Sequence, residues 1–88
     1  MSRAMYRYEV QVDDQPHPFF LTSGPVHVAA PSPNVVEFWA ENRGDEDGRQ
    51  RAFQVFGTGQ PLPDFARWVG TCDRTPGGLV WHLYEVGA

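Results

Sequence analysis

Four side chains near one corner of the chain are the residues best suited to bind a ligand. The segment Gly57-Thr58-Gly59-Gln60 ends an apolar run, and its glycines allow successive backbone N–H groups and a hydroxyl to face an anion. With an arginine and a histidine from neighbouring segments, the predicted ligand-binding set is Thr58, Gln60, Arg67 and His82. The alternative is a structural corner, because glycine at a strand end is often a backbone requirement and the two prolines that follow lack amide donors.

A second set of residues has the composition of a protein contact surface. Phe20 and Trp39 fall in the phases of their strands that we expect to face solvent. Exposed aromatic residues beside arginine are typical of the centre of a protein interface. The predicted protein-interaction residues are therefore Arg7, Phe20, Trp39 and Arg51. The alternative is that the polar loop or another copy of the chain covers these aromatics.

Catalytic and metal-binding patterns are weak in this sequence. Serine, histidine and aspartate occur in no nucleophile-elbow context, and a cysteine with a histidine arises by chance in chains of this length. His17 and His27 are not spaced to share a metal with each other or with Cys72. We predict no catalytic residues, no metal and no cofactor, which favours a binding protein over an enzyme.

Strands must position these residues, because apolar residues alternate with polar ones through most of the chain. In residues 6–12, Tyr6, Tyr8, Val10 and Val12 share one face, which predicts a strand with one buried side. Segment 35–41 places Val36, Phe38 and Ala40 in the core and its charged phase in solvent. In segment 26–30, Val26, Val28 and Ala30 are expected to face inward. The remaining predicted strands are 18–22, 50–56, 67–72 and 79–86, the last of them central because both of its phases are apolar.

Turn residues between these segments predict how the strands pair. We expect 6–12 and 18–22 to form an antiparallel hairpin, and 35–41 to pair with 50–56 across the polar loop 42–50. That loop is expected to be exposed and mobile, with an acidic cation site as the less favoured alternative. Residues 63–67 have room for a single helical turn. The predicted fold is all-β: one small antiparallel β-barrel or β-sandwich of six to seven short strands.

Length and composition limit the classes of protein to which the chain belongs. Eighty-eight residues, 41% hydrophobic and 14% aromatic, predict a single β-rich domain over 1–88 with a packed core. The net charge of −4 argues against binding the phosphate backbone of a nucleic acid. A lone cysteine, no signal-peptide core and no long apolar run predict a cytoplasmic protein that does not bind membranes.

Four motifs stand out along the chain: a tyrosine-rich opening at 6–9, the corner at 51–63, the step Trp68-Val69-Gly70-Thr71 and the closing segment 78–85. In these motifs the whole chain resembles a family of small uncharacterised proteins found in bacteriophages and their hosts. The sequence departs from the family pattern at Gln60, where histidine is frequent. The resemblance implies a phage or prophage setting in a bacterial cell, and the composition, rich in arginine and alanine, indicates an actinobacterial host or its phage.

Three functions are compatible with these observations. The first is a non-enzymatic binding module, either monomeric or homo-oligomeric, with which a phage engages a host protein. The second is a small-molecule or nucleotide binder, a sponge or sensor, that uses the 57–60 corner. The third is a minor structural protein of the virion.

Overall fold

Seven β-strands build the described part of the protein. The computed structural model describes residues 3–44 and 47–87. Within them the strands are β1 (Arg3–Gln11), β2 (His17–Leu21), β3 (Pro25–Ser32), β4 (Val35–Arg43), β5 (Arg49–Gly57), β6 (Arg67–Thr71) and β7 (Trp81–Gly87). All seven segments that were predicted to be strands are strands.

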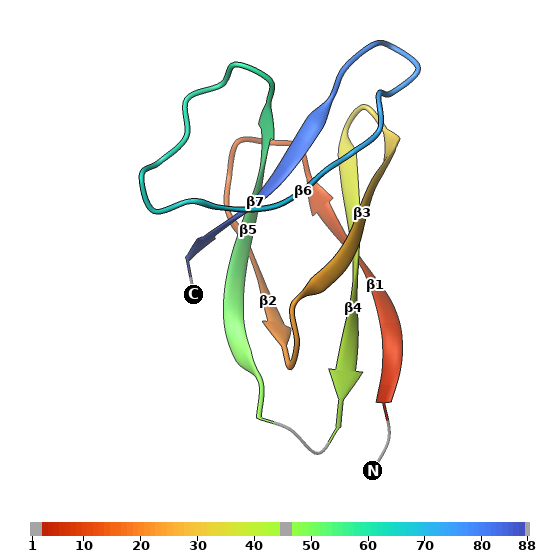
Figure 1. Cartoon of the computed structure of the whole chain (residues 1–88), viewed down its shortest axis with the longest axis vertical. Helices are drawn as coiled ribbons and strands as arrows, with labels where there is room; N and C mark the ends of the chain where they lie inside the picture. The colour runs from red at the N-terminus through yellow and green to blue at the C-terminus, as the bar shows by residue number, and fades with distance from the viewer. Residues whose placement is uncertain (1–2, 45–46, 88) are drawn as a thin grey trace.

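The strands form two antiparallel sheets that pack face to face (Figure 1). One sheet has three strands in the order β1-β4-β3, and the other has four in the order β2-β5-β7-β6. The prediction of an all-β fold is confirmed. Of the two predicted architectures, a β-barrel and a β-sandwich, the structure resembles the sandwich. β7 lies between β5 and β6, so its predicted central position is also confirmed.

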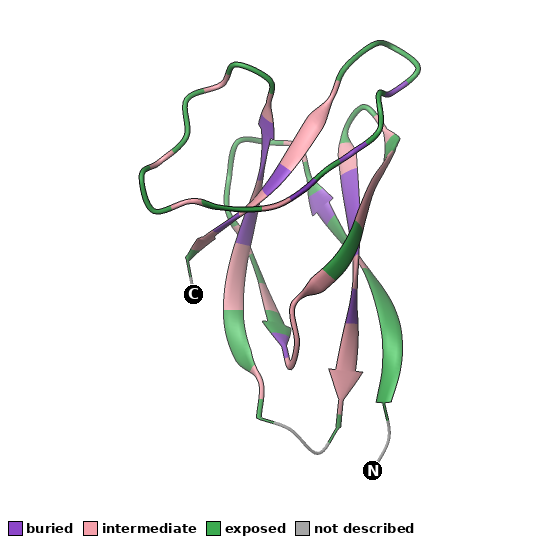
Figure 2. Cartoon of the chain, viewed as in Figure 1, coloured by how far each residue is buried: buried purple, intermediate pink, exposed green. Residues whose placement is uncertain are grey.

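The core lies between the two sheets, where Figure 2 shows the buried residues of β4, β5 and β7. Phe38 is fully buried and contacts three other rings: its centroid lies 4.9 Å from Tyr8, 5.3 Å from Phe19 and 5.1 Å from Phe53. The predicted core residues of β4 are confirmed, because Val36, Phe38 and Ala40 have no exposed area. The apolar residues at alternate positions of β4 are thus the ones that pack against the opposite sheet.

Both predicted hairpins are wrong. β1 pairs with β4, and β2 pairs with β5, so the chain crosses from one sheet to the other between β1 and β2 and again between β4 and β5. β5 pairs with β2 and β7, not with β4. The physical reason is that β1 and β4 each have one apolar face, which is buried only if β2 and β5 pack against it from the opposite sheet.

Three residues differ from the predicted faces. Tyr6 is 51% exposed, because this end of β1 extends beyond the aromatic cluster around Phe38. Val26 is 64% exposed, because the β3 register shifts between Pro25 and His27. Glu37 was expected in solvent but is buried, and an Arg7 Nη1–H donates to its carboxylate at 2.6 Å.

The connections are shorter or simpler than predicted. Residues 63–67 form a turn closed by a hydrogen bond from the Ala66 N–H to the Pro63 carbonyl at 3.0 Å, and not a helical turn. β4 and β5 take up both ends of the predicted polar loop. The predicted mobility and acidic site of that loop concern Asp45 and Glu46, which lie outside the described residues.

Candidate functional site

The Gly57–Gln60 corner is a tight turn that satisfies its own polar groups. The Gln60 N–H donates to the Gly57 carbonyl at 3.1 Å, and Gly59 has a φ of 86°, which glycine adopts readily. The Gln60 side chain accepts a hydrogen bond from the Gly57 N–H at 3.0 Å and donates one to Asp14 at 3.1 Å. Gln60 thus stabilises the turn and ties it to the loop between β1 and β2. These bonds favour the structural interpretation of the corner.

A chain of side-chain hydrogen bonds runs from this corner to the edge strand β6. His82 Nε2 lies 2.8 Å from the Thr58 hydroxyl, and His82 Nδ1 lies 3.0 Å from the Thr71 hydroxyl. The Trp68 indole N–H donates to the same Thr71 oxygen at 3.0 Å. The arrangement fixes the orientation of the Trp68 ring, although 62% of that residue is exposed.

The structure brings together three of the four predicted ligand-binding residues. Thr58, Gln60 and His82 line a shallow hollow of about 150 Å³ on the outer side of the four-stranded sheet. Phe56 is buried there against Tyr84, with ring centroids 5.6 Å apart. The residues around the hollow therefore serve mainly to cover the Phe56 ring. Arg67 lines a different hollow and pairs with Glu85.

The four predicted protein-interaction residues lie on three separate surfaces. Arg7 and Trp39 are cross-strand neighbours on the outer face of the three-stranded sheet, where the Trp39 ring lies 5.3 Å from His27. Phe20 is 60% exposed on the outer face of the other sheet, opposite Gln50. Arg51 is mostly buried and bonded to Glu85. The structure does not gather them into one patch.

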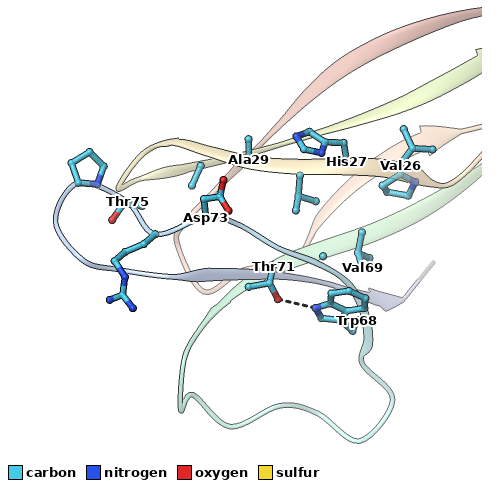
Figure 3. A pocket seen from close by; sticks show the side chains of 14 residues that line it. Val26, His27, Ala29, Trp68, Val69, Thr71, Asp73 and Thr75 are labelled. Carbon is cyan, nitrogen blue, oxygen red and sulfur yellow. Dashed lines mark hydrogen bonds between the residues drawn. The ribbon is translucent and has the colours of Figure 1, made fainter.

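Sequence reasoning missed a groove between the two sheets. Figure 3 shows it between β3, which contributes Val26 and His27, and the segment from β6 onward, which contributes Trp68 and Thr71. Its volume is about 520 Å³, and residues 25–30 line one side and 68–71 with 73–76 the other. β3 and β6 are each the last strand of a sheet, so the groove follows two edge strands.

Gly70 marks the closest approach of the two sides of the groove. A Cβ built on it would lie 2.7 Å from Val28 Cγ2, a distance that real side chains do not tolerate. The glycine therefore permits β6 to pack against β3. Gly70 inside a predicted strand was the sequence signal for this close contact, since an interior glycine often marks backbone packed tightly against a neighbour.

A second hollow extends the groove. It has a volume of about 290 Å³, shares Pro25, Trp68 and Val69 with the first, and is also lined by Gly24, Arg51, Arg67 and Glu85. Arg51 donates from Nε to Glu85 Oε2 at 2.9 Å and from Nη2 to Oε1 at 2.8 Å. Arg67 Nη2 lies 3.4 Å from the same Oε1. One buried carboxylate thus neutralises part of the charge of two arginines.

This ion pair makes stability depend on pH. The hydrogen bonds from Arg51 lower the pKa of Glu85 below its usual 4.5, with Arg67 and Arg49 adding to the effect. A carboxyl whose pKa is lowered on folding stabilises the protein fully above its unfolded pKa and loses that contribution as pH falls through the folded pKa.

We expect the free energy of unfolding to fall as pH drops below about 4.5. Urea titrations from pH 6 to pH 3 measure this, and in Glu85→Gln the slope should be smaller; an equal slope in both would contradict it.

Cys72 is not placed to act as a nucleophile. It is buried, and burial raises the pKa of its thiol to about 11, with Asp73 adding to the shift. The thiolate needed for attack is therefore scarce at neutral pH.

Among residues 3–44 and 47–87, no three His, Cys, Asp or Glu side chains gather in a group that could hold a metal ion. Within the same residues no helix has the length and apolar character needed to cross a membrane.

Comparison with other proteins identifies the family of the chain. No curated protein and no solved structure shows significant similarity to it. A family described as a domain of unknown function, DUF7352, matches residues 1–88, which is the full length of the sequence. On this match the chain belongs to the DUF7352 family.

Proposed function

We propose that this protein is a non-enzymatic binding module that holds an extended polypeptide segment in the groove between β3 and β6. The observation that carries the proposal is the groove itself, which runs along two edge strands and continues into the hollow at Arg51 and Arg67. From the resemblance in the sequence, we further propose that the segment belongs to a protein of a bacterial host and that the module comes from a phage or prophage.

The shape of the groove favours a chain over a compact ligand. Residues 25–30 line one side, and at about 3.3 Å per residue such a stretch spans roughly 17 Å. Small-molecule sites usually enclose most of their ligand. This groove instead follows two strand edges, with β3 on one side and the segment that starts at β6 on the other, as a site for an extended segment would (Figure 3).

The rim of the groove carries the residues expected of a contact surface. Trp68 is 62% exposed and Val26 is 64% exposed on the two sides. Tryptophan is enriched among the residues that contribute most to protein binding, and an ordered ring loses little entropy on binding. The hydrogen bond to Thr71 holds the Trp68 ring ready for a partner.

The edge strands indicate how a segment would be held. The register of β3 shifts twice, and the register of β6 shifts between Trp68 and Gly70. Such irregular edges permit only local main-chain pairing. Side chains on the rim should therefore supply most of the affinity.

The test is selection from a display library of random seven-residue peptides, each flanked on both sides by carrier protein. We expect enrichment of peptides whose binding shifts the NMR signals of β3 and β6. Failure to enrich any peptide, or signal changes confined to other surfaces, would overturn the proposal.

Trp68→Ala should weaken the binding of a selected peptide by about 30-fold or more, because loss of a tryptophan that anchors a partner costs about 2 kcal/mol or more. Phe65→Ala is the matched control, since Phe65 is 68% exposed but does not line the groove. Isothermal titration measures both dissociation constants. Equal effects of the two substitutions would contradict the role given to Trp68.

A further inference from the structure

The arginines at one end of the groove indicate the chemistry of its partner. Arg51 and Arg67 line the hollow that continues the groove, next to the Trp68 rim. Trp68 and Arg67 both line this hollow, so a segment that lies in it can contact both residues.

The local charge at this end is positive although the protein as a whole carries −4. Glu85 faces both guanidinium groups, and Arg49 lies near enough to act on the same carboxylate. One carboxylate thus lies among three arginines. An incoming negative charge would complement this excess.

Arg51 and Arg67 have different parts in this cluster. The Arg51 side chain is only 17% exposed, and two of its N–H groups are bonded to Glu85. The Arg67 side chain is 72% exposed and meets Glu85 through Nη2 at 3.4 Å. Since a guanidinium has five N–H donors, Arg67 keeps donors for a partner.

We propose that Arg67 binds an aspartate or glutamate side chain of the segment in the groove, while Arg51 and Glu85 hold the floor of the hollow in place. The inference rests on the proposed function. A carboxylate is the expected group because the planar fork of arginine matches its two oxygens. The hollow is open to solvent, so the bound chain can continue past Arg67, which favours an acidic side chain over a chain terminus.

The test uses the peptides selected from the display library, in which both ends of each peptide are joined to carrier protein. We expect an acidic residue to be enriched at one position of the selected pool. Arg67→Gln should weaken the binding of a selected peptide by about 10- to 100-fold, the usual effect of losing a hydrogen bond to a charged group. Replacing the acidic residue of the peptide with its amide should weaken binding to the wild type equally, and should cause no further loss in Arg67→Gln.

Arg3→Gln is the matched control. It removes the same charge from β1, and the Arg3 side chain is 66% exposed, so peptide affinity should stay within about twofold. Thermal melts of both variants verify that they fold. Selection on Arg67→Glu should favour basic residues at the position that was acidic.

The outcomes separate this inference from the proposed function. A pool that binds the groove and depends on Trp68, but has no acidic preference and tolerates Arg67→Gln, overturns the inference alone. A pool that never enriches overturns both. Selected peptides made as free acids and as C-terminal amides should bind equally, and a loss on amidation would overturn the assignment to a side chain.

Discussion

Replacing Phe38 with alanine should destabilise the protein by about 3–5 kcal/mol, the usual cost of removing a fully buried phenylalanine. Phe38 has no exposed area and contacts the rings of Tyr8, Phe19 and Phe53, which come from both sheets. A domain of this size has a total stability of roughly 4–13 kcal/mol, so the loss is a large fraction of the total. The midpoint and slope of urea unfolding measure the change.

Phe65→Ala is the control for this experiment. Phe65 is 68% exposed, and substitutions at exposed positions usually change stability by less than about 0.5 kcal/mol. If Phe38→Ala cost no more than Phe65→Ala, the two sheets would not be joined by the aromatic cluster described above.

Replacing Arg51 with alanine should cost about 3 kcal/mol, because it leaves Glu85 buried without its main partner. The Glu85 side chain is only 8% exposed and receives two hydrogen bonds from Arg51. The loss should fall at the lower end of the range for broken buried ion pairs, since Arg67 still lies 3.4 Å from the carboxylate. Guanidinium unfolding is unsuitable because the salt screens charges, so urea is the denaturant to use.

Two comparisons make this prediction specific to the pair. Arg3→Ala removes an exposed arginine that lies 3.7 Å from Glu41, and it should cost less than about 1 kcal/mol. The double variant Arg51→Met with Glu85→Leu should recover most of the loss, because an apolar pair of similar volume often replaces a buried ion pair without penalty. A double variant less stable than Arg51→Ala would contradict this account of the loss.

The strands could be predicted from the sequence because alternation is a local property. Val36, Phe38 and Ala40 occupy one phase of β4, and this phase is the buried one. The prolines and glycines between the segments likewise mark where strands end. Each of these inferences needs only a few neighbouring residues.

Pairing could not be predicted in the same way, because it depends on contacts between distant segments. The hairpin rule favours pairing of consecutive strands. Here β1 pairs with β4, although β2 and β3 lie between them in the sequence. Which strands become edges follows only from this pairing. The groove between β3 and β6 therefore could not be located from the sequence, although Gly70 signalled a close contact of its own strand.

The candidate site was predictable only where it is local. The glycines at 57 and 59 correctly indicated a corner, and Gly59 has the positive φ that glycine permits. Arg67 was expected beside Thr58 and His82, but it lies four residues from Thr71 along β6 and meets Glu85 instead. Its partner is 18 positions away in the sequence, and no pattern within one segment indicates such a pair.

The uneven edge of β3 also affects how copies of the protein behave when they are concentrated. A straight outer strand displays a repeating row of free amide and carbonyl groups on which another copy can grow into a fibre. Pro25 and Pro31 lack amide hydrogens, and the two register shifts of β3 interrupt the remaining row. Fibre growth from this side of the molecule is thus disfavoured, even at high protein concentration.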